Sequence, residues 1–150
     1  MLQGRHDTYP KRRGQTRARE LREAGINVGF GSDCMMDPWY SLGDADMLDV
    51  AHMGLHVGQL SSRADMAWCF EAITQNSAKI MGLTGYGLEM GCDASFVILE
   101  ASDPIEAIRL RAHRVAVFRK GRKVAQSPPV KYEIIMNDRR SELDEAKVAR

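Results

Sequence analysis

The chain has 150 residues and a formal net charge of +1, enough length for one hydrophobic core and therefore for one domain. This charge gives no electrostatic reason to expect nucleic acid or an anionic membrane as a partner, and no apolar run approaches the ~18 residues of a membrane span. Three cysteines without a CxxC spacing argue against a disulfide framework and favour the reducing cytoplasm.

The N-terminal part reads as a loop followed by a helix and a strand. Residues 2–14 show no apolar periodicity and contain Gly and Pro breaks, so His6 stays unassigned between a chemical role and a surface loop. Thr16 is a candidate cap for a helix over 17–24, with Gly25 as its stop. The β-branched and aromatic run 26–31 predicts a buried strand, and helix followed by strand is typical of a parallel α/β fold.

Asp33 is the candidate catalytic residue. It stands alone where the predicted strand passes into a loop, and in parallel α/β folds the loops at that end of the strands converge on the chemistry. The alternative is that Asp33 merely caps the next turn, a common role for Asp that the spacing by itself favours.

The middle of the chain predicts an ordered loop and then an amphipathic helix. Pro38 restricts the loop around Trp39, and Asp44 or Asp46 can cap a helix over about 47–60. His52 and His56 share one face of that helix. Zinc binding would need further ligands, so packed or supporting histidines are the favoured interpretation.

The remaining elements follow from caps, breaks and alternation. Ser62 and Asp65 predict a helix start, and one helix extends over 64–81 to Gly82. We then expect a turn and a strand ending at Leu99, a short helix over 103–111, a hairpin of 115–118 with 123–125 turning at Gly121, and a solvated or frayed tail from 127.

Several motifs in one order resemble a known enzyme family. They are Leu2-Gln-Gly-Arg5, Asp7 to Gly14, Gly31-Ser32-Asp33, Asp37-Pro38-Trp39-Tyr40, Leu42-Gly43 and His52-Met-Gly-Leu-His56-Val. Together they resemble the region around the eighth strand of cytosine deaminase and its close relatives in the amidohydrolase superfamily. The resemblance extends over roughly residues 1–125.

The resemblance implies the C-terminal fragment of a metal-dependent hydrolase TIM (β/α)8 barrel, with its last strand and flanking helices, plus part of a small β-sandwich. Residues 1–84 would belong to the barrel, 85–126 to the partial sandwich and 127–150 to a charged tail. A complete barrel needs about 200 residues or more. We therefore expect a piece produced by a truncated or split gene or a late start codon.

The resemblance also implies the chemistry. Asp33 matches the aspartate that binds a divalent metal, Zn or Fe, and carries the proton of the attacking water during hydrolytic deamination of a nucleobase or related heterocycle. Trp39 would lie at the mouth of the pyrimidine pocket. Cys34 would also contact the substrate. Cytosine deaminase commonly has a second aspartate at this position, so the cysteine casts doubt on cytosine itself as the substrate. The favoured interpretation of Cys34 is a space-filling side chain without nucleophilic chemistry.

The family's HxH pair, further metal histidines and catalytic glutamate do not occur in this chain, so we expect the isolated chain to be inactive and not to retain the metal. Its expected partners are a small heterocyclic substrate in the intact enzyme and either a second copy or a complementing N-terminal fragment. The alternative is a non-enzymatic remnant that associates with a full-length relative.

Overall fold

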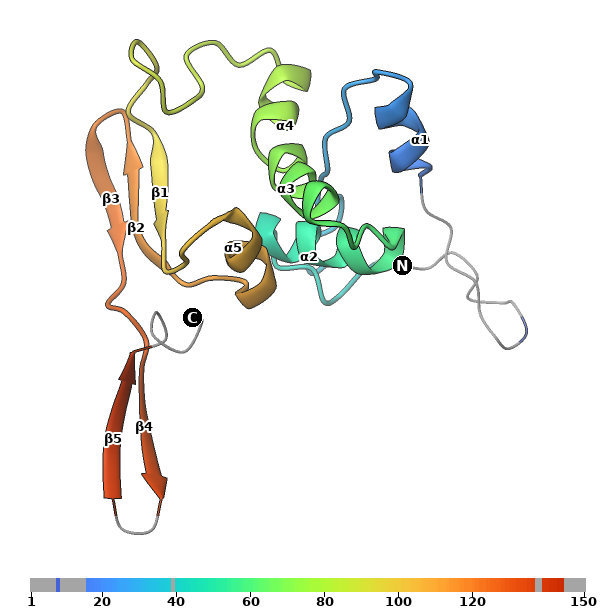
Figure 1. The fold of residues 1–150 in the computed structure, drawn as a ribbon. Helices are drawn as coiled ribbons and strands as arrows, with labels where there is room; N and C mark the ends of the chain where they lie inside the picture. Colours follow the sequence, from blue (N-terminus) through green and yellow to red (C-terminus); the bar gives the residue numbers. More distant parts are fainter. Residues whose placement is uncertain (1–7, 9–15, 39, 137–138, 145–150) are drawn as a thin grey trace. The chain divides into compact units, whose positions relative to one another are not determined.

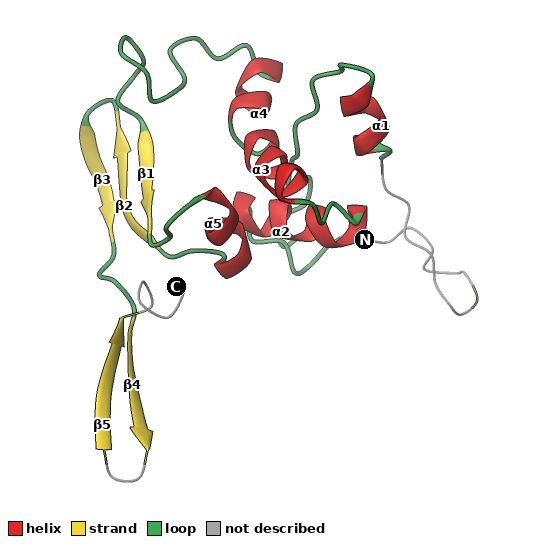
Figure 2. Ribbon diagram, in the orientation of Figure 1, coloured by secondary structure: helices red, strands yellow, loops and turns green. Residues whose placement is uncertain are grey.

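The computed structural model describes residues 8, 16–38, 40–136 and 139–144. Its contacts divide the chain into two compact units, Met1–Leu83 and Thr84–Arg150. Among the described residues, the regular elements of the first unit are helices, and the second unit contains the strands and one helix (Figures 1 and 2). No helix in the described ranges is long and apolar enough to cross a membrane.

The described part of the first unit has four helices, each separated from the next by a loop or a tight break. They are α1 Ala18–Glu23, α2 Met47–Gly58, α3 Arg63–Ala72 and α4 Gln75–Ile80. The Asp46 side chain caps α2 by accepting the Leu48 N–H, which decides between the two predicted aspartates. Ser62 caps α3 by accepting the Asp65 N–H, as predicted.

The predicted cap of α1 is wrong. Arg17 occupies the cap position, and no side chain caps the helix there. Thr16 contributes its backbone carbonyl instead, which accepts the Ala18 N–H at 2.7 Å. The predicted stop is confirmed, since Gly25 follows the last turn with φ +76°, a conformation that glycine adopts without strain.

The single helix predicted over 64–81 is broken between α3 and α4. Thr74 leaves helical geometry with φ −125° and ψ −97°, and its hydroxyl donates to the Phe70 carbonyl at 2.7 Å. The break exposes the Ala72 carbonyl, which accepts bonds from the Ser77 hydroxyl at 2.7 Å and from the Phe30 N–H at 2.9 Å. The apolar periodicity continues across the break, so the sequence pattern predicts one continuous helix there.

The strand predicted over 26–31 forms no ladder with any described residue. From Ile26 to Ser32 the backbone runs without a turn or bend, so the local conformation follows the β-branched composition. A strand also requires a neighbour, and the described residues of this unit provide none.

Aromatic packing against the helices fixes this extended segment. The ring of Phe30 meets that of Trp68 edge to face, with centroids 5.6 Å apart. A Cβ on Gly54 would lie 2.8 Å from Phe30 Cε2, so α2 approaches the ring closely only because it has glycine there. The buried apolar residues of the first unit, among those the structure describes, are Ala18, Leu48, Ala51, Leu60, Trp68, Cys69, Ala72 and Ala78.

The second unit has an antiparallel three-stranded sheet in the order β1-β2-β3, formed by Phe96–Leu99, Arg114–Arg119 and Arg122–Gln126. Helix α5, Pro104–Leu110, connects β1 to β2, and Asp103 caps it by accepting two N–H groups. The predicted hairpin is confirmed, with Gly121 at φ +75°.

The C-terminal segment contains regular structure that was not predicted. β4, Lys131–Met136, pairs antiparallel with β5, Arg139–Asp144. Tyr, Ile and Ile in the first strand favour β structure. The high charge of the segment led to the expectation of a frayed end.

Candidate active site

Asp33 lies at the end of the extended segment and lines a cavity of about 240 Å³. Its φ of +60° turns the chain out of the extended conformation at this residue. The other walls come from the loop that follows and from the first turns of α2. The lining residues are Gly31, Ser32, Asp33, Cys34, Tyr40, Leu42, Gly43, Asp44, Asp46, Asp49, Val50 and Met53.

The loop after Cys34 closes on itself and forms one wall of the cavity. The Met36 N–H donates to the Gly43 carbonyl at 3.1 Å, and the Tyr40 N–H donates to Asp37 Oδ1 at 2.9 Å. A Cβ on Gly43 would lie 2.1 Å from the Cys34 carbonyl oxygen. The loop therefore holds this shape only with glycine at position 43.

The cavity is acidic, and two of its four carboxylates have local structural roles. Asp46 caps α2, and Asp44 Oδ1 accepts the Asp46 N–H at 2.8 Å. A hydrogen bond to the Asp37 carboxylate raises the pKa of the Cys34 thiol, with further increases from burial and from the nearby Asp33 charge. Cys34 is therefore a neutral thiol at pH 7.

The structure brings two of the three predicted site residues together. Asp33 and Cys34 line the same cavity, whereas Trp39 lies outside the described residues. Tyr40 is a lining residue that sequence reasoning missed. The signal was available in the Asp37-Pro38-Trp39-Tyr40 run, where two adjacent aromatic residues offered two candidates.

The two histidines of α2 do not line this cavity. Their ring centroids are 4.4 Å apart, and His56 Nδ1 lies 2.8 Å from the His52 carbonyl oxygen, to which it donates. His52 is half-buried as expected of a packed residue, but His56 is exposed. Across the described ranges, no three His, Cys, Asp or Glu side chains lie close enough to hold a metal ion.

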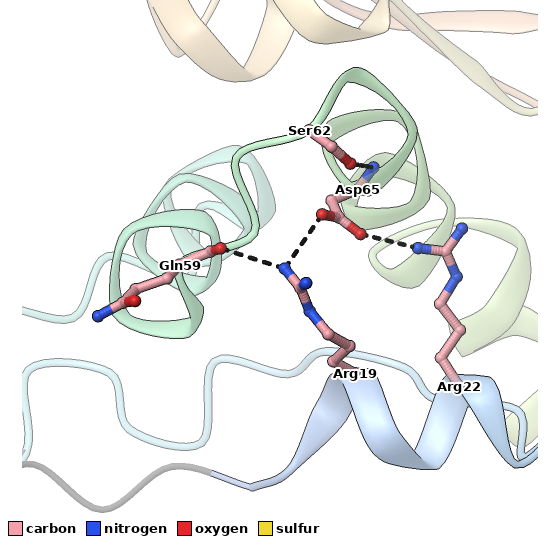
Figure 3. Close-up of polar contacts among 5 residues, drawn as sticks. All are labelled: Arg19, Arg22, Gln59, Ser62 and Asp65. Atoms are coloured by element: carbon pink, nitrogen blue, oxygen red, sulfur yellow. Dashed lines mark hydrogen bonds and ion pairs between the residues drawn. The ribbon is translucent and has the colours of Figure 1, made fainter.

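An ion-pair cluster that the sequence did not predict joins α1 to α3. Arg19 and Arg22 of α1 reach the two carboxylate oxygens of Asp65 on α3, at 3.2 and 3.1 Å (Figure 3). Arg19 also donates to the Gln59 carbonyl, and Arg22 lies 5.0 Å from the Trp68 ring centroid. A hydrogen bond from Ser62 lowers the pKa of the Asp65 carboxyl, and the arginine charges lower it further.

This cluster holds α1 against α3, and the extended segment lies between these helices in the sequence. Phe30 is bonded to the last turn of α3, and the side chains of Asn76 and Ser77 donate to the Val28 and Phe30 carbonyls at 3.1 and 3.3 Å. These bonds at Val28 and Phe30 hold the extended segment that leads to Asp33.

Comparison with known proteins places these features in a family. The amidohydrolase family profile matches residues 1–125. N-isopropylammelide isopropyl amidohydrolase of Pseudomonas sp. (strain ADP) is 34% identical over 118 residues, which are 78% of this chain and 28% of that protein. Pterin deaminase of Rhizobium rhizogenes is 33% identical over 131 residues, which are 85% of this chain and 29% of that protein.

A solved structure of a deaminase is also similar to this chain. The 5-methylcytosine deaminase of Klebsiella pneumoniae, in complex with 5-fluorocytosine, matches with a TM-score of 0.79 and 41% identity, covering 84% of this chain and 31% of that one. The chain thus spans less than a third of the length of each of these relatives. With a profile match over most of its length, the chain belongs to the amidohydrolase family.

Proposed function

We propose that this chain is the part of a cytosine deaminase-like amidohydrolase that carries Asp33, and that the completed enzyme hydrolytically deaminates a nucleobase or related N-heterocycle in the cytoplasm. The reaction class is hydrolysis of a C–N bond in a cyclic amidine. The observation that carries the proposal is the position of Asp33 beside Cys34 on the wall of a 240 Å³ cavity, within the segment that matches the family.

Asp33 has the chemistry that this role requires. An ionised carboxylate is an oxygen ligand for a divalent metal and also a proton acceptor. Its position on the cavity wall lets it meet a small heterocycle. We assign it the tasks of holding the metal, Zn or Fe, and moving a proton between the attacking water and the leaving ammonia.

The described residues do not fit a complete metal centre, because no trio of ligating side chains surrounds Asp33. Catalytic metal sites commonly use three protein ligands or more. We therefore assign no metal-dependent step to the isolated chain and propose that it is inactive alone. The remaining ligands would come from the part of the family fold that this chain does not span.

The class of substrate that we propose depends on Cys34, Trp39 and Tyr40. A neutral thiol beside Asp33 changes the charge and hydrogen bonding of the pocket relative to a second carboxylate. The relatives' names cover 5-methylcytosine, pterin and N-isopropylammelide, so heterocycles with amino or alkylamino substituents are the class to test. Trp39 remains a proposed contact, and Tyr40 joins it because it lines the cavity.

The test is ammonia release. The purified 150-residue chain, loaded with Zn or Fe, is incubated with cytosine, 5-methylcytosine and pterin, and compared with the chain co-expressed with the unmatched portion of the Klebsiella enzyme. We expect no ammonia from the isolated chain and substrate-dependent ammonia from the co-expressed pair. Release by the isolated chain that Asp33→Asn abolishes would refute the proposed inactivity, and no release from a purified, soluble pair would refute the proposed function.

A second candidate is a non-enzymatic module that associates with a full-length relative or with a second copy of itself. The observation in its favour is the exposed apolar surface of the first unit, where Met53 and Val57 of α2 are 42% and 38% exposed. Stable association without any gain in metal content or activity would favour this candidate.

A further inference from the structure

His52 and His56 of α2 form a pair that the proposed function does not use. They are four residues apart and therefore share one face of the helix, and their ring centroids lie 4.4 Å apart at an interplanar angle of 44°. Neither residue lines the cavity that contains Asp33. Two imidazoles on one helix face can bind one transition ion through their ring nitrogens.

The distance between the two rings fits a shared ion. A metal–nitrogen bond of about 2.1 Å puts the ion about 3.2 Å from each ring centroid, so two adjacent imidazole ligands have centroids about 4.5–5 Å apart. The observed distance of 4.4 Å lies just below this range. Because His56 is exposed, a small rotation of its side chain is enough to make up the difference.

The hydrogen bond of His56 leaves one ring nitrogen for a metal. Its Nδ1 lies 2.8 Å from the His52 carbonyl oxygen, and a carbonyl oxygen only accepts, so Nδ1 carries the proton. In the neutral ring, Nε2 then has the free lone pair. Histidines that bind metals usually donate their other ring N–H to a backbone carbonyl or a carboxylate, which fixes the orientation of the ring. His56 has this arrangement.

The charge around the pair favours a cation. Helix α2 contains Asp49 and has neither Lys nor Arg in its sequence. His56 lies in the last turn of this 12-residue helix, where the partial negative charge of the helix end attracts cations. His52 is half-buried, and the ion requires only one of its two ring nitrogens.

We propose that His52 and His56 bind one divalent transition ion of the class that prefers imidazole, namely Cu²⁺, Ni²⁺ or Zn²⁺. No third His, Cys, Asp or Glu within the described ranges lies close enough to join them, so water completes the coordination. Mixed nitrogen and oxygen ligands suit Cu²⁺ and Ni²⁺ best, and two protein ligands give a weaker site than three or four. The inference does not depend on the proposed function, because Asp33 is not one of the ligands.

The test measures nickel binding by the tag-free 150-residue chain and its variants with isothermal titration calorimetry. We expect one Ni²⁺ per wild-type chain, and we expect His52→Gln and His56→Gln each to weaken the affinity by about tenfold or more, because a single ligand replaces the chelating pair. His6→Gln is the matched control and should bind nickel like the wild type, as should Asp33→Asn, which tests the cavity as the alternative location. Mg²⁺, which prefers oxygen ligands, should not compete.

Thermal unfolding followed by circular dichroism gives a second measurement. An ion held by His52 and His56 links two consecutive turns of folded α2, so Ni²⁺ should raise the Tm of the wild type and leave the Tm of His56→Gln unchanged. Because His56 is exposed, His56→Gln should keep the helical signal of the wild type. This variant decides the question if His52→Gln weakens the fold.

Three results would overturn the inference. They are undiminished nickel binding by His56→Gln, loss of binding in His6→Gln or Asp33→Asn, and half an ion per chain with nickel-dependent dimers in size-exclusion chromatography, which would indicate an ion shared by two copies. One ion per chain that requires both His52 and His56 would support the site, whether or not the completed enzyme releases ammonia.

Discussion

Replacing Asp65 with asparagine tests how the ion-pair cluster supports the first unit. The side chain of Asp65 is only 13% exposed and faces Arg19 and Arg22, at 3.2 and 3.1 Å (Figure 3). Asparagine keeps the size of the side chain and one acceptor oxygen but removes the charge. The cap of α3 survives, because the Ser62 hydroxyl accepts the backbone N–H of residue 65, which the substitution leaves in place.

The expected loss follows from the number and exposure of the contacts. Exposed ion pairs contribute about 0.2–1 kcal/mol each, and a hydrogen bond to a charged group contributes about 1.5–3 kcal/mol where it is well buried. Both arginines are at least 36% exposed, so we place the total loss for Asp65→Asn near the lower values, at about 1–2 kcal/mol. For a unit of this size, that is a fall in Tm of about 5–15 °C.

The pH dependence gives the sign of the effect. The folded state lowers the pKa of Asp65 below its ordinary value of 3.8, so the carboxylate stabilises the fold above about pH 4. This stability is lost as the pH falls through the lowered pKa of the folded state. The difference between wild type and Asp65→Asn should therefore be full at pH 7 and vanish in strong acid.

Thermal or urea unfolding followed by circular dichroism measures both quantities. Glu23→Gln is the matched control, because Glu23 lies on α1 and makes no ion pair within the described residues. We expect this control to stay within about 0.5 kcal/mol of the wild type. An Asp65→Asn protein as stable as the wild type at pH 7, or one whose deficit persists unchanged in strong acid, would refute the reasoning.

Three smaller changes test other parts of the structure. Gly43→Ala should destabilise the loop by about 1–3 kcal/mol in urea unfolding because its Cβ would overlap the Cys34 carbonyl, while Gly31→Ala, with open space around its Cβ, should not. Asp37→Asn should lower the pKa of Cys34 and speed its alkylation by iodoacetamide at mildly alkaline pH; an unchanged rate would contradict the assigned hydrogen bond. Asp103→Ala should cost about 1 kcal/mol of unfolding free energy because two N–H groups of α5 lose their acceptor, and an unaffected urea midpoint would argue against the cap.

Local signals in the sequence predicted most helices well because their causes are local. Asp46, Ser62 and Asp103 each cap the helix that follows, and such caps depend on residues only two or three positions away. The break between α3 and α4 was not predicted, because it depends on hydrogen bonds from Thr74 and Ser77 and on the approach of Phe30 from a distant segment.

The site was predictable in part. Asp33 and Cys34 stand out by their place after an apolar run, and the structure does put both on one cavity. The cluster of Arg19, Arg22 and Asp65 was not predictable, because its partners are more than 40 residues apart and nothing in their spacing links them. The composition of segment 26–31 predicts a strand, and the segment is indeed extended. Strand pairing also requires a neighbouring strand, and the composition of one segment does not predict whether such a strand is present.

The most direct test of the central claim compares two aspartates of the same cavity. In the complex with the unmatched portion of the Klebsiella enzyme, kcat for ammonia release is measured for Asp33→Asn and for Asp44→Asn, which keeps the oxygen that accepts the Asp46 N–H. We expect Asp33→Asn to lower kcat by about 10²–10⁴-fold, as for loss of a general acid–base group, and Asp44→Asn to change it little. Equal effects of the two substitutions, or an active Asp33→Asn complex, would contradict the assignment of Asp33.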